Sequence, residues 1–256
     1  MTLLEVKNLK KIYTTRFGGN QVQALADVSF SVEEGEFVAI MGESGSGKTT
    51  LLNILAALDR PTSGTVLLNG TDLSGIKEHK MAAFRRDNLG FVFQDFNLLD
   101  TFSVKDNIFL PLVLSKTPYE EMERRLAPLA GKLGLTDLLN KFPYEISGGQ
   151  KQRTAAARAL ITNPHILLAD EPTGALDSKA SKNLLEIMTR MNRDMGATIL
   201  MVTHDAYSAS YAARVLFLKD GRLFHELLRG ERGRPVFYHE VLDVLALLGG
   251  DVSDVI

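Results

Sequence analysis

The stretch EFVAIMGESGSGKTTLLNILAAL, residues 36–58, places an apolar run, a glycine-rich loop and a helix-length segment in direct succession. Within it, GESGSGKT at residues 42–49 matches the pattern G-x-x-x-x-G-K-[ST], which is informative where it follows a strand and opens a helix. Backbone N–H groups in such a loop can surround a phosphate, and the lysine can reach its oxygens. The stretch therefore predicts a phosphate-binding loop, the P-loop, and an ordinary strand-to-helix turn is the alternative.

The P-loop supplies most of a candidate site for a nucleoside triphosphate. Lys48 is expected to contact β- and γ-phosphate oxygens during catalysis, and the Thr49 hydroxyl to hold Mg²⁺. Tyr13 is a candidate stacking platform for adenine, although a lone tyrosine at a strand end is a core or edge residue at least as often. The predicted nucleotide-contacting set is Tyr13, Gly42, Glu43, Ser44, Gly45, Ser46, Gly47, Lys48, Thr49 and Thr50.

Composition restricts the classes of protein to which the chain can belong. With 256 residues, 45% of them hydrophobic, it can bury a large core as one domain with a subdomain. A formal net charge of −2 provides no basic field, so a stand-alone nucleic-acid-binding protein is not expected. The chain has no cysteine, which excludes disulfides, zinc ribbons and thiol catalysis. No window approaches the roughly 18 apolar residues of a membrane span, so we expect the chain itself in the cytosol.

Short apolar runs alternate with helix-length amphipathic segments along most of the chain, which predicts an α/β fold with a mostly parallel sheet. Residues 3–13 and 214–227 instead alternate apolar with polar residues, the second stretch around an Asp220-Gly221 turn. These two stretches predict antiparallel additions to the parallel core.

The pattern becomes helical between residues 95 and 160. A capping box is predicted to begin at Thr117, and Pro128 is expected to kink or end the helix that follows. We therefore predict three parts, namely a nucleotide-binding α/β core over residues 1–94 and 161–228, an inserted helical subdomain over 95–160 and a short C-terminal helical tail over 229–256.

Three further apolar runs end in polar residues that nucleotide hydrolysis can use. HILLAD ends in Asp170, a candidate Mg²⁺ ligand, and Glu171 follows as a candidate general base for the attacking water. The two carboxylates are expected to point in different directions, because consecutive strand residues face opposite ways. Gln94, after GFVF, can complete the metal shell or direct the water. His204, after TILMVT, can contact the γ-phosphate, although taken alone it would more often be structural.

A second glycine-rich stretch, EISGGQKQRTAAARAL, covers residues 145–160. It places Ser147, Gly148 and Gly149 at a predicted helix start, where N–H donors and the helix dipole favour an anion. No lysine follows these glycines directly. A purely structural turn at the helix start is the alternative, because serine and glycine are common there.

The motifs occur in the order Tyr13, GESGSGKT, Gln94, ISGGQKQR, ILLADEP, GALD and His204. In this order and spacing the chain resembles the ATP-binding cassette (ABC) ATPases over about residues 1–228. The resemblance implies a P-loop NTPase core of the RecA type, ATP and Mg²⁺ as ligands, and a head-to-tail dimer of two copies. It implies that Asp177 lies at the dimer interface, and that a signature loop closes over the γ-phosphate bound by the other copy. The signature residues are Ser147, Gly148, Gly149 and Gln150.

A finer resemblance is carried by ADEPTGALD and by FQDFNLLDTFSVKDNIFLPL. These stretches look like cassettes of the macrolide-exporter and lipoprotein-release type, and within that group most like the ATPases of bacitracin- and lantibiotic-resistance exporters. Such a resemblance implies a membrane permease as partner, often a membrane sensor kinase, no nucleic acid, and a position on the cytoplasmic face of the membrane. A macrolide-export or lipoprotein-release cassette is the nearest alternative, and a soluble ABC ATPase acting on DNA or ribosomes is the alternative from another class.

The loop after Gln94 is too apolar for an ordinary exposed segment. We expect its apolar residues to form a groove for a cytoplasmic helix of the permease, which a change of nucleotide state could move through Gln94. The alternative is that they only fill the core of the helical subdomain. The residues are Phe96, Leu98, Leu99 and Phe102.

Overall fold

A computed structural model of the chain describes residues 1–14, 20–93, 96–174 and 176–249. The chain divides into two compact units, which are described one at a time below. Unit 1 comprises Met1–Lys77 and Thr198–Ile256, and unit 2 comprises Glu78–Ala197. This division does not test the three parts predicted from the sequence, which stay a prediction.

One part of the sheet in unit 1 is antiparallel. β1 pairs antiparallel with β2 and with β4, and β4 pairs antiparallel with β5. Along β1, Val6 and Leu9 are buried whereas Lys7 and Lys10 are exposed, which is typical of a sheet with one covered face. The antiparallel addition predicted from residues 3–13 is confirmed. The strands are β1 Thr2–Thr14, β2 Gln21–Glu33, β4 Ser63–Leu68 and β5 Thr71–Asp72.

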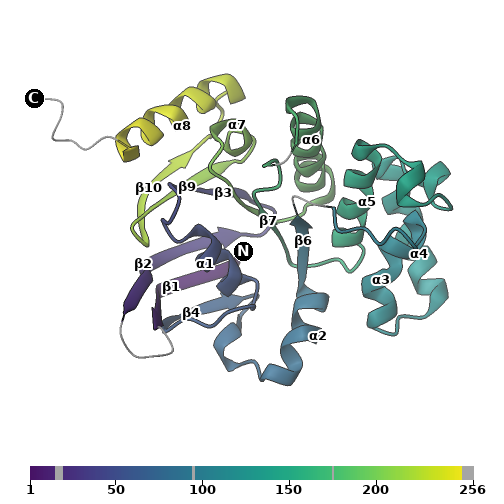
Figure 1. The fold of residues 1–256 in the computed structure, drawn as a ribbon, viewed down its shortest axis with the longest axis horizontal. Helices are drawn as coiled ribbons and strands as arrows, with labels where there is room; N and C mark the ends of the chain where they lie inside the picture. The colour runs from purple at the N-terminus through teal and green to yellow at the C-terminus, as the bar shows by residue number, and fades with distance from the viewer. Residues whose placement is uncertain (15–19, 94–95, 175, 250–256) are drawn as a thin grey trace, which may run out of the picture. The chain divides into compact units, whose positions relative to one another are not determined.

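The other part of this sheet is parallel and fully buried. β3 (Phe37–Met41) lies between β8 (Ile199–Val202) and β9 (Arg214–Lys219) and is parallel to both. All residues of β3 and β8 are buried, as expected for parallel strands covered on both faces. The strand order in unit 1 is β5-β4-β1-β2-β10-β9-β3-β8, where β10 is Arg222–Leu228. The strands from β4 to β3 are labelled in Figure 1.

β9 returns through a tight turn into β10 (Arg222–Leu228), which is antiparallel to it. The two central residues of the turn, Asp220 and Gly221, have φ values of 49° and 69°, the left-handed conformation that a two-residue hairpin turn requires. The predicted hairpin is confirmed. The parallel pairing of β9 with β3 was not predicted, because alternation within one strand says nothing about the neighbour on its other side.

The C-terminal helix of unit 1, α8 (Arg234–Gly249), packs against the rest of the unit. Phe237 and Val241 of α8 are fully buried, and the guanidinium of Arg234 lies 4.2 Å from the ring centroid of Tyr211. Lys219 Nζ donates a 2.9 Å hydrogen bond to the carbonyl oxygen of Leu248 near the end of α8. The short helices flanking the sheet and α8 are α1 Lys48–Leu55, η1 Leu73–Gly75, α7 Ala206–Ala209 and α8 Arg234–Gly249.

Unit 2 combines two parallel strands with a cluster of helices. α5 packs against α3, α4 and α6, and its buried face contains the small residues Ala155, Ala156 and Ala157, which allow close approach (Figure 1). The strands are β6 Leu89–Phe93 and β7 Ile166–Asp170. The helices are α2 Glu78–Asn88, α3 Val104–Leu114, α4 Tyr119–Leu133, η2 Thr136–Leu138, η3 Pro143–Glu145, α5 Gly148–Leu160 and α6 Ser178–Met195.

One local prediction for α4 is wrong. The helix begins at Tyr119 with Pro118 as its N-cap and without a side-chain cap, so Thr117 does not open a capping box. The helix also continues past Pro128 to Leu133, so it does not end at the proline, and a kink there stays a prediction. Leu126 and Leu129, on either side of Pro128, are buried, and this packing outweighs the single hydrogen bond that proline removes.

Among the residues described, no helix combines the length and the apolar character required to cross a membrane.

Candidate functional site

The P-loop follows β3 directly, and its glycines are required by close packing. A Cβ built at Gly42 would lie 2.2 Å from the carbonyl oxygen of Leu218, and one at Gly47 would lie 2.5 Å from the carbonyl oxygen of Ala24. Gly47 also has φ 103°, which side chains rarely tolerate. The loop is therefore held against its neighbouring backbone at both ends.

The side chain of Lys48 lies over this loop. Its Nζ donates 2.7 Å hydrogen bonds to the carbonyl oxygens of Gly42 and Glu43, so the ammonium group lies at the mouth of the loop. α1 begins at Lys48 with Gly47 as its N-cap and no side-chain cap, so its first N–H groups point outward without a side-chain acceptor. A helix start of this kind favours a phosphate. The predicted set differs in exposure: Glu43, Ser44, Gly45 and Thr49 are exposed, Thr50 is half-buried, and Ser46 is buried.

Tyr13 is fixed by two partners that the sequence did not indicate. Its hydroxyl donates a 2.8 Å hydrogen bond to Asp59 Oδ2, and Lys11 Nζ lies 4.7 Å from its ring centroid. Burial and the hydrogen bond to Asp59 raise the pKa of Tyr13, so the hydroxyl stays protonated and donating at neutral pH. The ring is partly exposed and held in place, as a stacking platform requires.

His204 lies at the same sheet edge as the P-loop within unit 1. It follows β8, and the ladder to β3 continues one residue further through a 3.1 Å hydrogen bond from Thr203 N to the carbonyl oxygen of Ile40. The carboxyl ends of parallel neighbours meet at one edge, which is where ligands bind in open α/β sheets. Asp205, next in the chain, fixes the local backbone by accepting hydrogen bonds from Tyr207 N and Ser208 N.

Asp170 and Glu171 occupy the end of β7 in unit 2. Asp170 is the last strand residue, whereas Glu171 has φ 43° and directly precedes Pro172. A left-handed glutamate before proline is an unusual and strained backbone conformation. Because Glu171 lies outside β7, strand alternation does not determine the direction of its side chain, and the predicted divergence of the two carboxylates stays a prediction. Gln94, the remaining predicted metal ligand, lies outside the described residues.

The signature loop caps α5 with its own side chains. The Ser147 hydroxyl accepts a 3.4 Å hydrogen bond from Gln150 N, and Gln150 Oε1 accepts a 2.7 Å bond from Ser147 N. This reciprocal capping box fixes the helix start and uses the Gln150 side-chain oxygen. Gly148 and Gly149 differ from the P-loop glycines, because a Cβ at either position would meet nothing within 4 Å.

The structure brings the signature glycines and Asp177 together in unit 2. Gly148, Gly149 and Asp177 line one cavity of about 400 Å³, along with Phe96 and Gln152. Asp177 is the N-cap of α6 and accepts hydrogen bonds from the N–H groups of Lys179 and Ala180, at 2.9 and 2.8 Å. Gln152 was not among the predicted site residues, although it stands within the ISGGQKQR motif. Its side chain is only 2% exposed, and its amide atoms have no hydrogen-bond partner among the described residues.

The four apolar residues after Gln94 are not uniformly buried. Leu99 and Phe102 are 43% and 37% exposed, whereas Phe96 and Leu98 are half-buried. Phe96 lines the cavity that contains the signature glycines, and none of the four lines a second hollow of unit 2, a cavity of about 450 Å³ between α2, β6, α3 and α5. Arg158, which does line it, donates hydrogen bonds of 2.7 and 2.6 Å to the carbonyl oxygens of Phe96 and Asn97. Burial lowers the pKa of this guanidinium.

Known proteins resemble this chain over nearly its whole length. The ABC transporter family matches residues 25–174. The chain is 56% identical to the ABC transporter ATP-binding protein YxdL of Bacillus subtilis (strain 168), over 98% of this chain and 96% of that protein. It is 46% identical to the bacitracin export ATP-binding protein BceA of Halalkalibacterium halodurans, over 99% of this chain and 100% of that protein.

A solved structure gives the same result for the fold. It is the dimeric structure of a post-hydrolysis state of the ATP-binding cassette MJ0796 bound to ADP and Pi, with a TM-score of 0.73 and 39% identity over 88% of this chain and 98% of that chain. The resemblance and the fold class predicted from the sequence are confirmed. The chain therefore belongs to the ABC transporter family, as an ATP-binding ATPase subunit.

Proposed function

We propose that this subunit drives an exporter that confers resistance to antimicrobial peptides of the bacitracin type. The observation that carries the proposal is the 46% identity to BceA over 254 residues, which extends beyond the family match at residues 25–174 and includes α8. Similarity confined to the nucleotide motifs would support ATP binding alone. In this role the chain sits at the cytoplasmic face of the membrane through a permease, and a membrane sensor kinase that reads transport is a further partner.

The residues of the site divide the chemistry between them. The P-loop and the first turn of α1 bind the phosphates of ATP, Lys48 moves from the loop carbonyls to the β- and γ-oxygens, and Tyr13 stacks on adenine. Glu171 takes the proton from the attacking water as general base, and His204 contacts the γ-phosphate. The strained backbone at Glu171 supports this assignment, because such strain concentrates at functional positions.

Mg²⁺ is the metal that the donor atoms fit. Thr49 and Asp170 offer hydroxyl and carboxylate oxygens, the ligands that Mg²⁺ prefers, and Gln94 is the proposed third residue. Bound there, Mg²⁺ would neutralise the charge that develops on the transferred phosphoryl group.

Two copies act as a head-to-tail dimer in this proposal. The signature residues Ser147, Gly148, Gly149 and Gln150 of one copy face the γ-phosphate held by the other, and Asp177 lies between the two sites. Open space around Gly148 and Gly149 supports this arrangement, since the chain itself gives no steric reason for glycine there. The dimeric state of MJ0796 supports it independently.

The permease docks on unit 2 in this proposal. The hollow between α2, β6, α3 and α5 has apolar walls from Phe91, Leu110 and Leu114, and its size suits one helix face. Arg158 ties this hollow to the loop that carries Leu99 and Phe102, which makes the loop a route from Gln94 to the permease.

The function is tested in cells that lack the gene for this chain but keep its permease. Wild-type protein should restore bacitracin resistance, and so should the matched variant Glu120→Gln on the exposed face of α4. Glu171→Gln should not restore it. Restoration of macrolide tolerance or lipoprotein release, with bacitracin sensitivity unchanged, would contradict the peptide assignment and favour the alternative cassettes.

Docking is tested by exposed leucines in the two units. Leu114 and Leu58 are 62% and 61% exposed, so replacement of either by serine removes a similar exposed side chain. Leu114→Ser should reduce co-purification with the permease, Leu99→Ser should reduce transport, and Leu58→Ser should change neither. Equal loss of permease association in Leu58→Ser and Leu114→Ser would contradict docking in this hollow.

A further inference from the structure

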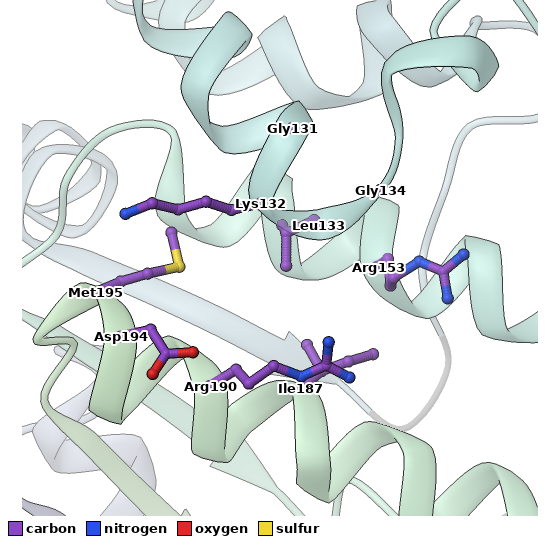
Figure 2. Close-up of a pocket in the computed structure, with 9 residues that line it drawn as sticks. All are labelled: Gly131, Lys132, Leu133, Gly134, Arg153, Ile187, Arg190, Asp194 and Met195. Atoms are coloured by element: carbon purple, nitrogen blue, oxygen red, sulfur yellow. The ribbon is translucent and has the colours of Figure 1, made fainter.

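A third cavity of unit 2 is separate from both the cavity of the signature glycines and the permease hollow. It measures about 400 Å³ and is lined by the end of α4, by α5 and by the C-terminal half of α6 (Figure 2). Leu133, Ile187 and Met195 form its apolar part. A cavity of this size accommodates the body of a small organic molecule.

Three cationic side chains line the same cavity: Lys132, Arg153 and Arg190. Among the described residues, none of the three has an ion-pair or hydrogen-bond partner, and Nε of Arg153 is buried without one. Figure 2 shows Arg190 extending along α6 towards the side on which Arg153 lies, whereas Lys132 points to the opposite side. The carboxylate in the lining, Asp194, lies 3.5 Å from the neighbouring Arg193.

Helix ends do not explain the two arginines. Lys132 is in the last turn of α4, where a cation offsets the negative end of the helix dipole. Arg153 lies in the second turn of α5, and Arg190 lies more than one turn before the end of α6 at Met195, so neither has this role. Lys132 and Arg190 are exposed, so water can satisfy their charges. The Nε of Arg153 is buried, and a buried guanidinium nitrogen without an acceptor is unfavourable unless a ligand supplies one.

We propose that this cavity binds an organic phosphate monoester. Guanidinium groups match phosphate oxygens in a bidentate way, and a phosphate monoester carries about −1.5 to −2 charge, which suits two arginines and a lysine better than one carboxylate would. The phosphate lies against Arg153 and Arg190, and the apolar part of the molecule against Leu133, Ile187 and Met195. The occupant joins α5 to α6, the helices whose N-cap residues are Ser147 and Asp177. This site goes beyond the proposed transport function and does not depend on it.

Titration of the full chain with hexyl phosphate, hexanoate and hexanol tests the site. Hexyl phosphate should bind more tightly than hexanoate, and hexanol should bind least. Arg153→Gln and Arg190→Gln should each weaken hexyl phosphate binding about 10- to 100-fold, the effect of one lost charge-assisted hydrogen bond. The matched variant Lys182→Gln removes a positive charge from α6 outside the lining and should bind like wild type. Hexanol binding as tightly as hexyl phosphate, or equal weakening in Lys182→Gln, would overturn the proposal.

Two further measurements locate the ligand without relying on the folding of the arginine variants. In wild-type protein labelled at its methionine methyl groups, hexyl phosphate should shift the Met195 resonance, and an unshifted Met195 would overturn the proposal. Binding should also persist in Lys48→Ala, and loss of binding in that variant would assign the phosphate to the P-loop instead. Co-sedimentation with phosphatidic acid vesicles that is lost in Arg190→Gln would identify a lipid headgroup as the source, whereas binding of hexyl phosphate alone would identify a soluble phosphate.

Discussion

The P-loop and the signature loop both contain glycines beside a helix start, but their glycines stand in opposite surroundings. A Cβ at Gly42 or Gly47 would lie 2.2 or 2.5 Å from a backbone oxygen of the same chain. A Cβ at Gly148 or Gly149 would meet nothing within 4 Å. The first pair is therefore explained by the fold of one chain, and the second pair is not.

The two helix starts differ in the same way. α1 has no side-chain cap, so its first N–H groups are left for a phosphate, whereas α5 is closed by the capping box of Ser147 and Gln150. A loop that is already capped and still keeps two unhindered glycines leaves room for something to approach closely from outside. The comparison supports the proposal that the signature loop acts on a group that another molecule brings, whereas the glycines of the P-loop are accounted for within one chain.

Neither loop provides the general base, so the largest expected effect comes from outside both. Glu171→Gln should slow ATP hydrolysis by about 10²–10⁴-fold while MgATP binding persists, because only proton abstraction is lost. Phosphate release and ATP affinity measure the two parts separately. Glu186→Gln, a half-buried glutamate on α6, serves as the control. Turnover at the wild-type rate with glutamine at position 171 would exclude Glu171 as the base.

Gly47→Ala tests the claim that the P-loop glycines are required by the fold. The substitution combines an unfavourable φ with a Cβ close to Ala24, so the free energy of unfolding should fall by about 2–5 kcal/mol. Gly45→Ala is the matched variant: Gly45 has φ 82° but open space, so only backbone strain of about 1–2 kcal/mol applies. Urea denaturation of both gives the comparison. Equal losses would show that backbone strain accounts for the whole effect and close packing for none.

Gly148→Ala, in the signature loop, should leave the stability of the protein intact, unlike Gly47→Ala in the P-loop. Stability should stay level or rise by at most about 1 kcal/mol, because alanine is the better helix former and the site is unhindered. ATP hydrolysis should nevertheless fall about tenfold, because a methyl group at a surface that another copy approaches misplaces the reacting groups. Gly75→Ala, also unhindered, should change neither quantity. Unchanged hydrolysis in a folded Gly148→Ala protein would remove the reason for treating this glycine as functional.

Sequence reasoning succeeded where a local pattern determines the structure. The strand, loop and helix around Gly42 to Thr49 and the hairpin turn at Asp220-Gly221 are set by neighbouring residues, and the structure has both. It failed for the capping box at Thr117 and for a helix end at Pro128, where burial of Leu126 and Leu129 in unit 2 favours continuation of the helix past the proline.

Within the candidate site, motif spacing predicts roles for Lys48, Asp170 and Ser147, and these roles stay predictions. The hydrogen-bond partner of Tyr13 could not be predicted, because Asp59 lies 46 positions away. The left-handed backbone at Glu171 could not be predicted either, since glutamate rarely adopts it. The spacing of neighbouring residues does not reveal a conformation that contacts with distant positions determine.

The last prediction concerns the number of ATP-binding sites that remain intact in a mixed dimer. One copy carries Lys48→Ala and the other carries Ser147→Arg, and the two are mixed as a dimer. If each signature loop serves the partner's P-loop, both defects fall in one composite site, and the second site keeps an intact P-loop and an intact signature. One ATP per dimer should then be held in the closed form, against two in the wild-type dimer, as measured by nucleotide content after size exclusion.

The matched control places both substitutions on the same copy and pairs it with a wild-type copy. On the trans arrangement each composite site then has one defect, so no site should retain ATP in the closed dimer. If each loop instead served its own chain, the two dimers would exchange outcomes: the doubly substituted copy would fail alone and leave one intact site, and the mixed dimer would have none. Loss of turnover does not separate these arrangements, because coupled sites stop together, and the number of ATP molecules bound in each dimer is therefore the decisive measurement.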